Sequence, residues 1–301
     1  MGGPLRQVRV DAFAKINLCL EVLGKRPDGY HDLRTIFQTI SLSDVMDVEF
    51  VPATRSRVEL ASTVEIPNNL AARAAEAFLE ATGVTGEVKL RLRKRIPMGG
   101  GLGGGSADAA AVLRALPLLS GCALPLPQLF EIATALGSDV PFFLLGGTAL
   151  GLGRGTELYP LANANAEHVL LLTPPIHSST AEAYASLART GDYHPENDWS
   201  ASTAQALAGG TEWGKFAVND FEEAIFATHP AIAQLHKRLE QAGARPARMT
   251  GSGAALFGVF DTAEKLVEAR RLLADVPSHA VHFVSGRKYR ASISDVTRRV
   301  N

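Results

Sequence analysis

A glycine-rich stretch followed at once by helix-forming residues is the part of this sequence best suited to chemistry. Residues 96–113 hold six glycines within seven positions and then become rich in alanine. Such glycines are kept where the backbone must adopt a positive φ or approach another group closely. Ser106 is a good N-cap residue, so we expect a helix to start there with Asp108 in its first turn. The free N–H groups and dipole of that helix would face the loop, an arrangement that binds phosphate.

Two common phosphate-binding motifs do not fit this loop. A P-loop has Lys and then Ser or Thr directly after its last glycine, whereas Ser106 and an alanine follow here. Gly99, Gly101 and Gly104 satisfy the spacing G-x-G-x-x-G of dinucleotide-binding proteins. That motif should follow a buried parallel strand and precede an acidic residue by about twenty positions. The preceding segment instead alternates apolar and basic residues, and the segment beyond the helix has no acid until Glu131.

The N-terminal residues predict a strand, a turn and a return strand. Apolar residues occupy every even position from 8 to 22, a period of two that is typical of a strand. Lys15 and Asn17 therefore lie side by side on the opposite face of that strand. The turn "RPDGYH" and the return strand "DLRTIFQTI" place Tyr30 and His31 at the edge of the hairpin.

Later segments predict the remaining elements. Helices are expected at "NNLAARAAEAFLEATG" and "PLPQLFEIATALG", which end at Gly83 and Gly137. The basic strand "VKLRLRKRI" is interpreted as a sheet with one solvated face. The segment "SDVPFFLLGGTALGLGRG" predicts two strands punctuated by glycines, with Asp139 at its start. Beyond about residue 160, strands and helices alternate as in a split βαβ domain.

Length, composition and charge set wider limits. A chain of 301 residues, 46% hydrophobic and 20% charged, can bury a large core and is expected to form two domains. Thirty Lys and Arg against 31 Asp and Glu leave a formal charge of −1, which favours neither nucleic acid nor an anionic membrane as a partner. Two cysteines and an N-terminus without an apolar signal segment predict a cytoplasmic protein. No apolar run is long enough to span a membrane.

Four motifs, taken in order, resemble those of a known family. "PMGGGLGGGSADAA" resembles the central motif of the GHMP kinases, which include galactokinase, homoserine kinase and mevalonate kinase. "AKINLCLEVLGKRPDGYHDLRTIFQTI", "LGSDVPFF" and "MTGSGAALFGVF" resemble the branch that acts on 4-diphosphocytidyl-2-C-methyl-D-erythritol. The resemblance extends from about residue 13 to residue 260.

The resemblance implies a fold and an activity. The fold would be α+β, with an ATP-binding, ribosomal-protein-S5-like domain at 1–160, a ferredoxin-like domain at 161–301 and an active-site cleft between them. The reaction would move the γ-phosphoryl group of ATP to the 2-hydroxyl of the acceptor, in the non-mevalonate isoprenoid pathway. ATP and Mg²⁺ would be the cofactors and small molecules the partners, with no nucleic acid or membrane, and the protein would be a monomer or homodimer.

The resemblance also implies roles for individual residues. Asp139 would accept the proton of the attacking hydroxyl, and Lys15 would orient that hydroxyl and neutralise charge. The residues implied for ATP binding are Asn69, Leu70, Lys94, Pro97, Met98, Gly99, Gly100, Gly101, Leu102, Gly103, Gly104, Gly105 and Ser106, with Ser106 also a ligand of Mg²⁺. The residues implied for acceptor binding are Asn17, Tyr30, His31, Thr180, Tyr184, Gly251, Ser252 and Gly253.

Several alternatives remain open on the sequence. Asn69 could simply cap a helix, Lys15 and Lys94 could be solvated charges, and Tyr184 could be a core residue. Another GHMP small-molecule kinase, of the mevalonate or homoserine type, would keep the glycine loop and Asp139 but should lack "DGYH". A non-enzymatic RNA-binding module should be basic overall, which this chain is not.

Overall fold

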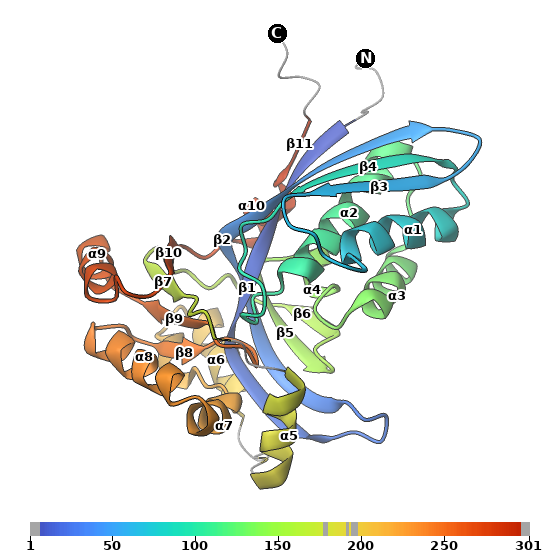
Figure 1. Cartoon of the computed structure of the whole chain (residues 1–301). Helices are drawn as coiled ribbons and strands as arrows, with labels where there is room; N and C mark the ends of the chain where they lie inside the picture. Colours follow the sequence, from blue (N-terminus) through green and yellow to red (C-terminus); the bar gives the residue numbers. More distant parts are fainter. Residues whose placement is uncertain (1–6, 177–179, 191–192, 194–197, 296–301) are drawn as a thin grey trace.

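The fold consists of two halves, each a β-sheet covered by helices, joined by one long hairpin (Figure 1). The computed structural model describes residues 7–176, 180–190, 193 and 198–295. Among these residues, a seven-stranded sheet forms the first half and a four-stranded sheet forms the second. Within the same residues, every helix is too short or too polar to cross a membrane.

The larger sheet is built around the antiparallel pair β1 and β2. Its order is β11-β1-β2-β4-β3, with β5 paired to β2 and β6 paired to β5. All neighbours are antiparallel except β3 and β4. The strands are β1 (Gln7–Lys25), β2 (His31–Pro52), β3 (Arg57–Ser62), β4 (Gly86–Arg93), β5 (Thr148–Gly153), β6 (Glu157–Pro160) and β11 (Ile293–Asp295).

Four helices pack on one face of this sheet. They are α1 (Leu70–Thr82), α2 (Gly104–Ser120), α3 (Leu126–Leu136) and the single turn α4 (Phe142–Leu145). The side of α1 that faces the core has buried residues at positions 71, 74, 75 and 78, the spacing of one helical face. Asn69 caps this helix, because its Oδ1 accepts a hydrogen bond from the N–H of Ala71 at 2.9 Å. Gly83, with φ of 67°, ends it as predicted.

The second half is a four-stranded antiparallel sheet of order β10-β7-β9-β8 with helices around it. Its strands are β7 (Val169–Leu172), β8 (Ala247–Met249), β9 (Leu256–Val259) and β10 (Ser278–Val281). The helices that follow β6 along the chain are α5 (Thr180–Thr190), α6 (Trp199–Ala208), the 3₁₀ helix η1 (Trp213–Phe216), α7 (Phe221–Thr228), α8 (Pro230–Gln241), α9 (Ala263–Leu272) and α10 (Gly286–Arg290). The strands and helices that the sequence predicts beyond residue 160 are therefore present, but they do not simply alternate: in the described part of the chain five helical elements separate β7 from β8, and β9 follows β8 directly.

The hairpin belongs to both halves. The even positions of β1 from Val8 to Val22 are buried, which confirms the predicted period of two. From Phe13 to Glu21 the odd positions are buried as well. Over this stretch the even residues Ala14, Ile16 and Leu18 pack in one cluster with strands β7, β9 and β10 of the second half. A bridge between Leu20 and Asn219 ties the hairpin to the second half directly.

Two local predictions are wrong. Ser106 does not cap α2, because the helix begins at Gly104 and its N-cap is Gly103, at φ of 70°. Gly103 accepts this left-handed conformation without a steric cost, so the helix starts earlier and Asp108 lies in its second turn. The first strand expected in "SDVPFFLLGGTALGLGRG" is instead the helical turn α4, because Pro141 has the helical angles φ −56° and ψ −39°.

The predicted boundary near residue 160 lies between β6 and β7, and it stays a prediction. The chain crosses it again at the end, where β11 returns to the first sheet and pairs with β1. In that register Val8 lies opposite Asp295. The two ends of the described chain therefore meet in one sheet.

Candidate active site

A cavity of about 870 Å³ is lined by residues from both halves of the molecule. It is lined by the glycine loop before α2, the turn before α4, the β1–β2 hairpin and the turn between β5 and β6. The starts of α5 and α7 and the turn after β8 complete its walls. The predicted site residues that line it are Lys15, Asn17, Tyr30, His31, Gly101, Gly103, Ser106, Asp139, Tyr184, Gly251 and Ser252. The fold thus brings together residues from segments far apart in the sequence.

Lys15 and Asp139 form an ion pair in this cavity. The Nζ of Lys15 lies 3.5 Å from Oδ2 of Asp139 and donates a hydrogen bond of 2.8 Å to Oδ1 of Asn17. Lys15 is only 4% exposed, so its interpretation as a solvated strand lysine is wrong. The Nδ2 of Asn17 donates to Thr35 at 2.7 Å, which fixes the amide with its oxygen toward Lys15. The ammonium group is therefore held in one position against the carboxylate.

The glycine loop packs backbone against backbone on the turn after β8. A Cβ at Gly101 would lie 2.5 Å from the carbonyl oxygen of Thr250. A Cβ at Gly253 would lie 2.6 Å from the carbonyl carbon of Gly100. The hydroxyl of Thr250 also accepts a hydrogen bond from the N–H of Asn17 at 3.0 Å. The glycines of both segments are thus required for the contact between the halves, in addition to any role in binding phosphate.

Lys94 lies beneath the glycine loop between two buried carboxylates. Its Nζ donates to Asp44 and, at 2.9 Å, to Oδ2 of Asp108. A Cβ at Gly104 would lie 3.1 Å from this Nζ. Burial opposes the charge of Lys94, but Asp108 and Asp44 outweigh it and raise the pKa of the lysine. The interpretation of Lys94 as a solvated charge is therefore wrong. Its amine instead packs close to Gly104, where the glycine loop joins α2.

Asp108 is the member of this buried group whose polar atoms are least fully hydrogen-bonded. Burial, partly offset by the charge of Lys94, raises the pKa of Asp108 to about 7. Its Oδ1 is buried without a hydrogen-bond partner among the described residues. Between its usual pKa of 3.8 and about 7, the unfolded chain is ionised at this position while the folded chain keeps the proton. The contribution of Asp108 to stability therefore falls as the pH rises through this window.

We expect Asp108→Asn to remove this part of the pH dependence of stability. The amide cannot ionise, so the melting temperature of the variant relative to wild type should rise steadily from pH 4 to pH 7. Thermal unfolding at several pH values measures the difference. Asp261→Asn, at an exposed ion pair with Lys265, is the control and should show no such trend in this window. A constant difference between Asp108→Asn and wild type would contradict the prediction.

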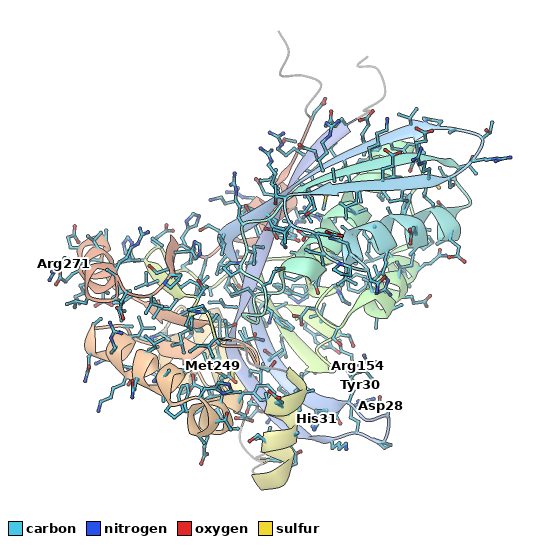
Figure 2. All side chains as sticks on the ribbon, viewed as in Figure 1. Asp28, Tyr30, His31, Arg154, Met249 and Arg271 are labelled. Atoms are coloured by element: carbon cyan, nitrogen blue, oxygen red, sulfur yellow. The ribbon has the colours of Figure 1, made fainter. Side chains whose placement is uncertain are left out.

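Aromatic side chains line the cavity wall around the end of the hairpin. The rings of His31 and Tyr184 stack with centroids 4.4 Å apart and an angle of 19° between their planes. Burial and then the nearby charge of Lys25 lower the pKa of His31, so its ring is neutral at neutral pH. Burial and then the charge of Asp139 raise the pKa of Tyr184 to about 12. Tyr30 is half exposed beside this stack (Figure 2).

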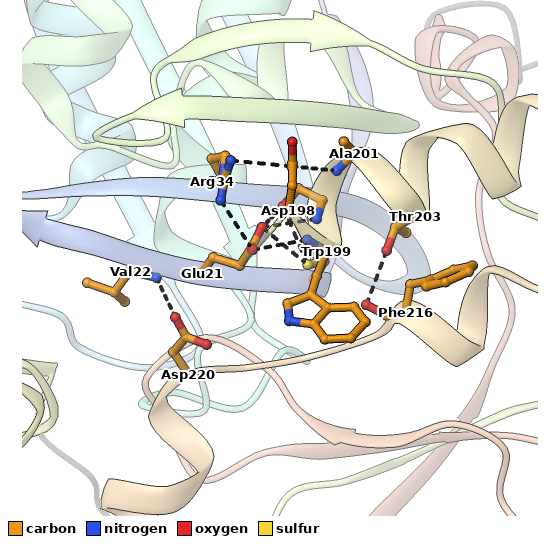
Figure 3. Close-up of polar contacts among 11 residues, drawn as sticks. Glu21, Val22, Arg34, Asp198, Trp199, Ala201, Thr203, Phe216 and Asp220 are labelled. Carbon is orange, nitrogen blue, oxygen red and sulfur yellow. Dashed lines mark hydrogen bonds and ion pairs between the residues drawn. The ribbon is translucent and has the colours of Figure 1, made fainter. Parts of the chain in front are cut away.

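A buried carboxylate anchors the hairpin to α6 (Figure 3). The carboxylate of Glu21 accepts hydrogen bonds from the N–H groups of Trp199 and Ser200, at 3.1 and 3.0 Å. The guanidinium of Arg34, on the return strand, lies 3.5 Å from Glu21 and 3.3 Å from Asp198. A carboxylate at the N-terminus of a helix is stabilised by the free N–H groups and the helix dipole. This contact fixes the part of the hairpin that leads to Tyr30 and His31.

Comparison with known proteins identifies the family. Residues 69–147 match the GHMP kinases N terminal domain, and residues 205–277 match the GHMP kinases C terminal domain. The 4-diphosphocytidyl-2-C-methyl-D-erythritol kinase of Solibacter usitatus (strain Ellin6076) is 48% identical over 289 residues, which cover 95% of this chain and 92% of that protein. The chain belongs to the 4-diphosphocytidyl-2-C-methyl-D-erythritol kinase family of the GHMP kinases. A member of that family from Pelotomaculum thermopropionicum is 41% identical over 87% of this chain and 91% of its own.

Solved structures agree with this assignment. A crystal structure of 4-(cytidine 5'-diphospho)-2C-methyl-D-erythritol kinase superposes with a TM-score of 0.80 and 37% identity, covering 91% of this chain and 98% of that one. Homoserine kinase from Cytophaga hutchinsonii superposes with a TM-score of 0.73 at 16% identity, covering 98% of both chains, and shows the shared fold alone. The predicted α+β GHMP kinase fold is confirmed.

The other predicted site residues are not among those that line the cavity. Leu102 is buried in the core, Met98 is 66% exposed, and Gly253 packs on Gly100. Thr180 begins α5, and its side chain lies outside the described part of the chain. The remaining members of the predicted ATP-binding set that are not on the wall are Asn69, Leu70, Lys94, Pro97, Gly99, Gly100, Gly104 and Gly105.

Sequence reasoning missed several residues of the cavity wall. Thr35 and Phe37 come from the return strand, where period two would have placed them on one face with His31. Arg154 comes from the segment "GLGRG", where a basic residue between two glycines was the available signal. Lys25 lies opposite His31 in the hairpin, so the predicted turn was the available signal for it. Phe221 gave no signal in the sequence, because only the packing of the two halves brings it to the cavity.

We expect Gly101→Ala to raise the KM for ATP by about tenfold or more, because a residue at φ of +77° is strained and its Cβ would push Thr250 away. Steady-state kinetics with varied ATP measures the effect. Gly121→Ala is a matched control, since Gly121 has a similar φ of +72° at the end of α2 but nothing within 4 Å of its Cβ. That control should lose some stability and keep its KM for ATP. An unchanged KM in folded Gly101→Ala would contradict the prediction.

Proposed function

We propose that this chain transfers the γ-phosphoryl group of ATP to the 2-hydroxyl of 4-diphosphocytidyl-2-C-methyl-D-erythritol, in the non-mevalonate isoprenoid pathway. One observation carries the proposal. A single cavity holds the Lys15–Asp139 pair, the glycine loop at a helix N-terminus, and the His31–Tyr184 stack. These are the parts that a phosphoryl transfer to a nucleotide-linked alcohol needs: a proton acceptor, a phosphate site and a site for a base.

The glycine loop is proposed to bind ATP. The N–H groups between Gly99 and Ser106 would surround the phosphates at the N-terminus of α2, a preorganised electrostatic site. Asn69, Leu70 and Lys94 would lie toward the nucleoside. Leu70 supports this placement, because its Cδ1 would lie 3.7 Å from a Cβ at Gly105, at the edge of the loop.

Mg²⁺ is proposed to enter with ATP. This hard cation binds proteins through few side chains and through nucleotide phosphates. The hydroxyl of Ser106 fits the role of a ligand, because it lines the cavity and makes no hydrogen bond within the described part of the chain. When bound, the ion would neutralise charge on the phosphates.

Asp139 and Lys15 are proposed to act on the reacting hydroxyl. The carboxylate of Asp139, about one third exposed, would accept the proton as the hydroxyl attacks phosphorus. The ammonium of Lys15 would hold the hydroxyl in line and reduce the charge that develops. Their separation of 3.5 Å allows both groups to contact one oxygen atom.

The aromatic end of the cavity is proposed to bind the cytidine. The Nε2 of His31 is buried without a hydrogen-bond partner in the described residues, and this ring nitrogen would pair with the polar edge of the base. Tyr30 and Tyr184 offer ring faces for stacking. Asn17, Thr180 and the turn Gly251–Ser252–Gly253 would contact the methylerythritol and close the site.

We also propose the cellular compartment, the partners and the oligomeric state of the protein. Both cysteines are free thiols, as expected of a cytoplasmic protein. The substrates would be small molecules rather than nucleic acid, and the protein would act as a monomer or homodimer with domains at 1–160 and 161–301.

ADP release in the presence of different acceptors tests the function. We expect turnover with 4-diphosphocytidyl-2-C-methyl-D-erythritol and none above background with mevalonate, homoserine or galactose. Turnover with mevalonate or homoserine instead would favour another GHMP kinase. A salt-sensitive gel shift with RNA, without turnover of any acceptor, would favour the binding module.

We expect Tyr30→Ala to weaken acceptor binding by the ~1–3 kcal/mol typical of stacking on a base, and to leave ATP binding unchanged. The exposed ring of Tyr30 supports few core contacts, so the fold should tolerate the change. Separate KM values for acceptor and ATP measure the effect, and Tyr30→Phe, which keeps the ring, is the control. Equal losses for both substrates would show that Tyr30 is structural.

A further inference from the structure

Arg154 reaches into the acceptor side of the cavity from the turn between β5 and β6. Its guanidinium carbon lies 3.4 Å from the centroid of the Tyr30 ring, within the range of a cation–π contact. Figure 2 shows Arg154 and Tyr30 side by side near the end of the hairpin, with Asp28 next to them. Asp28 is engaged by Arg26 at 3.1 Å. The charge of Asp28 also attracts Arg154, but no hydrogen bond or ion pair joins Arg154 to a carboxylate within the described residues, so its main contact is the ring of Tyr30.

The hydrogen-bond donors of Arg154 are unused. Its Nε is buried and has no partner within the described residues, and no other atom of its guanidinium donates to a described residue. A buried donor without a partner costs free energy unless something else satisfies it. The residue lines the cavity, so a ligand bound there is the available partner.

The turn holds Arg154 in a restricted position. Gly153 and Gly155, on either side, both have positive φ, at 63° and 83°. The N–H of Gly155 donates to the carbonyl of Leu152 at 3.0 Å, which closes the turn. The backbone thus fixes the Cα and Cβ of Arg154, while its guanidinium lies over the ring of Tyr30.

The charge of the cavity matches an anionic ligand near Arg154. The lining residues include the cations Lys15, Lys25 and Arg154, and Asp139 is the only carboxylate among them in the described part of the chain. Lys15 is already committed to Asp139 and Asn17. A guanidinium binds two phosphate oxygens at once through its parallel N–H groups, whereas an ammonium acts as a point charge.

We propose that Arg154 is a specificity-determining residue of the acceptor site, where its guanidinium binds the diphosphate of the nucleotide-linked acceptor while it holds Tyr30 against the base. This inference rests on the proposed function, because it names the group that would recognise the diphosphate of that acceptor. One side chain would then couple recognition of the base to recognition of the phosphates.

Binding of cytidine and of cytidine diphosphate to the full chain tests the proposal. Calorimetric titration is done with saturating ADP, which occupies the glycine loop and leaves the acceptor side free. We expect wild type to bind cytidine diphosphate about 10- to 100-fold more tightly than cytidine, the range of charge-assisted hydrogen bonds. Arg154→Met keeps an apolar stem over Tyr30 and should reduce this preference to about twofold or less. Arg154→Lys keeps the charge but not the planar head and should give an intermediate preference.

Arg271→Met is the matched control, because Arg271 lies on the exposed face of α9, paired with Glu268 and far from the cavity (Figure 2). It should keep the preference of wild type. Preserved preference in Arg154→Met, with a wild-type melting temperature, would overturn the proposal, as would equal losses for cytidine and cytidine diphosphate. If wild type binds neither ligand, the proposed function itself fails, which is a different outcome from failure of the Arg154 assignment.

Discussion

Asp139→Asn should lower kcat by about 10²–10⁴-fold and leave the KM values for ATP and acceptor nearly unchanged. The amide has the size and polarity of the carboxylate but cannot accept the proton of the attacking hydroxyl. Phosphoryl transfer depends on alignment and on the spreading of charge, so the loss falls on the transition state rather than on binding. Lys15→Met removes the ammonium and keeps most of its volume, and we expect a loss of similar size.

The double variant separates a shared role from two independent roles. Lys15 and Asp139 lie 3.5 Å apart and would act on one hydroxyl, so the double variant should lose less than the product of the single losses. Measurements of kcat, both KM values and the melting temperature for all three variants test this. Asp275→Asn, at the exposed ion pair with Arg238, is the control for a carboxylate-to-amide change. A folded Asp139→Asn enzyme with near-wild-type kcat would refute the assignment of the proton acceptor.

Lys94→Met should destabilise the protein by about 3–5 kcal/mol, the range found when one partner of a buried ion pair is removed. The change would leave the carboxylates of Asp44 and Asp108 buried together without the cation between them. Asp44 also accepts hydrogen bonds from the N–H groups of Arg95 and Ile96, just before the glycine loop. Loss of the lysine should therefore disturb the backbone that leads into the loop.

Urea unfolding of Lys94→Met against wild type measures this cost. Combining it with Asp108→Asn should restore part of the stability, because one of the two opposed carboxylates is then neutral. Lys237→Met, at an exposed lysine of α8 with no ion pair among the described residues, is the control and should change stability by less than about 0.5 kcal/mol. A small effect of Lys94→Met, or no recovery in the double variant, would contradict this account of the buried group.

Local signals predicted much of the fold and part of the site. The period of two in β1, the turn at "RPDGYH" and the glycine ends of α1 and α3 depend on neighbouring residues, so the sequence was enough to find them. The predicted position of the α2 N-cap was wrong, because Gly103 and not Ser106 precedes the first helical residue, in a left-handed conformation where a Cβ would lie 2.8 Å from Phe143.

Contacts between segments that are distant in the chain could not be predicted from the sequence. The sequence leaves Lys94 as a possible solvated charge, because its partner Asp44 is fifty positions away and meets it only through the pairing of β2 with β4. Arg154 meets Tyr30 only because β5 pairs with the return strand β2. Many of the residues that the family resemblance implies for the site do line one cavity. The backbone contact between the glycines of the two halves could not be predicted, because no pattern in the sequence indicates it.

The return of β11 to the first sheet bears on how the protein is made. While the ribosome is synthesising the chain, β1 can pair with β2 early, but its other edge stays open until the last strand emerges. An open strand edge is a template for pairing with another chain. The edge of β1 at Val8–Val10 is therefore open to pairing with another chain until β11, the last strand of the described chain, closes it.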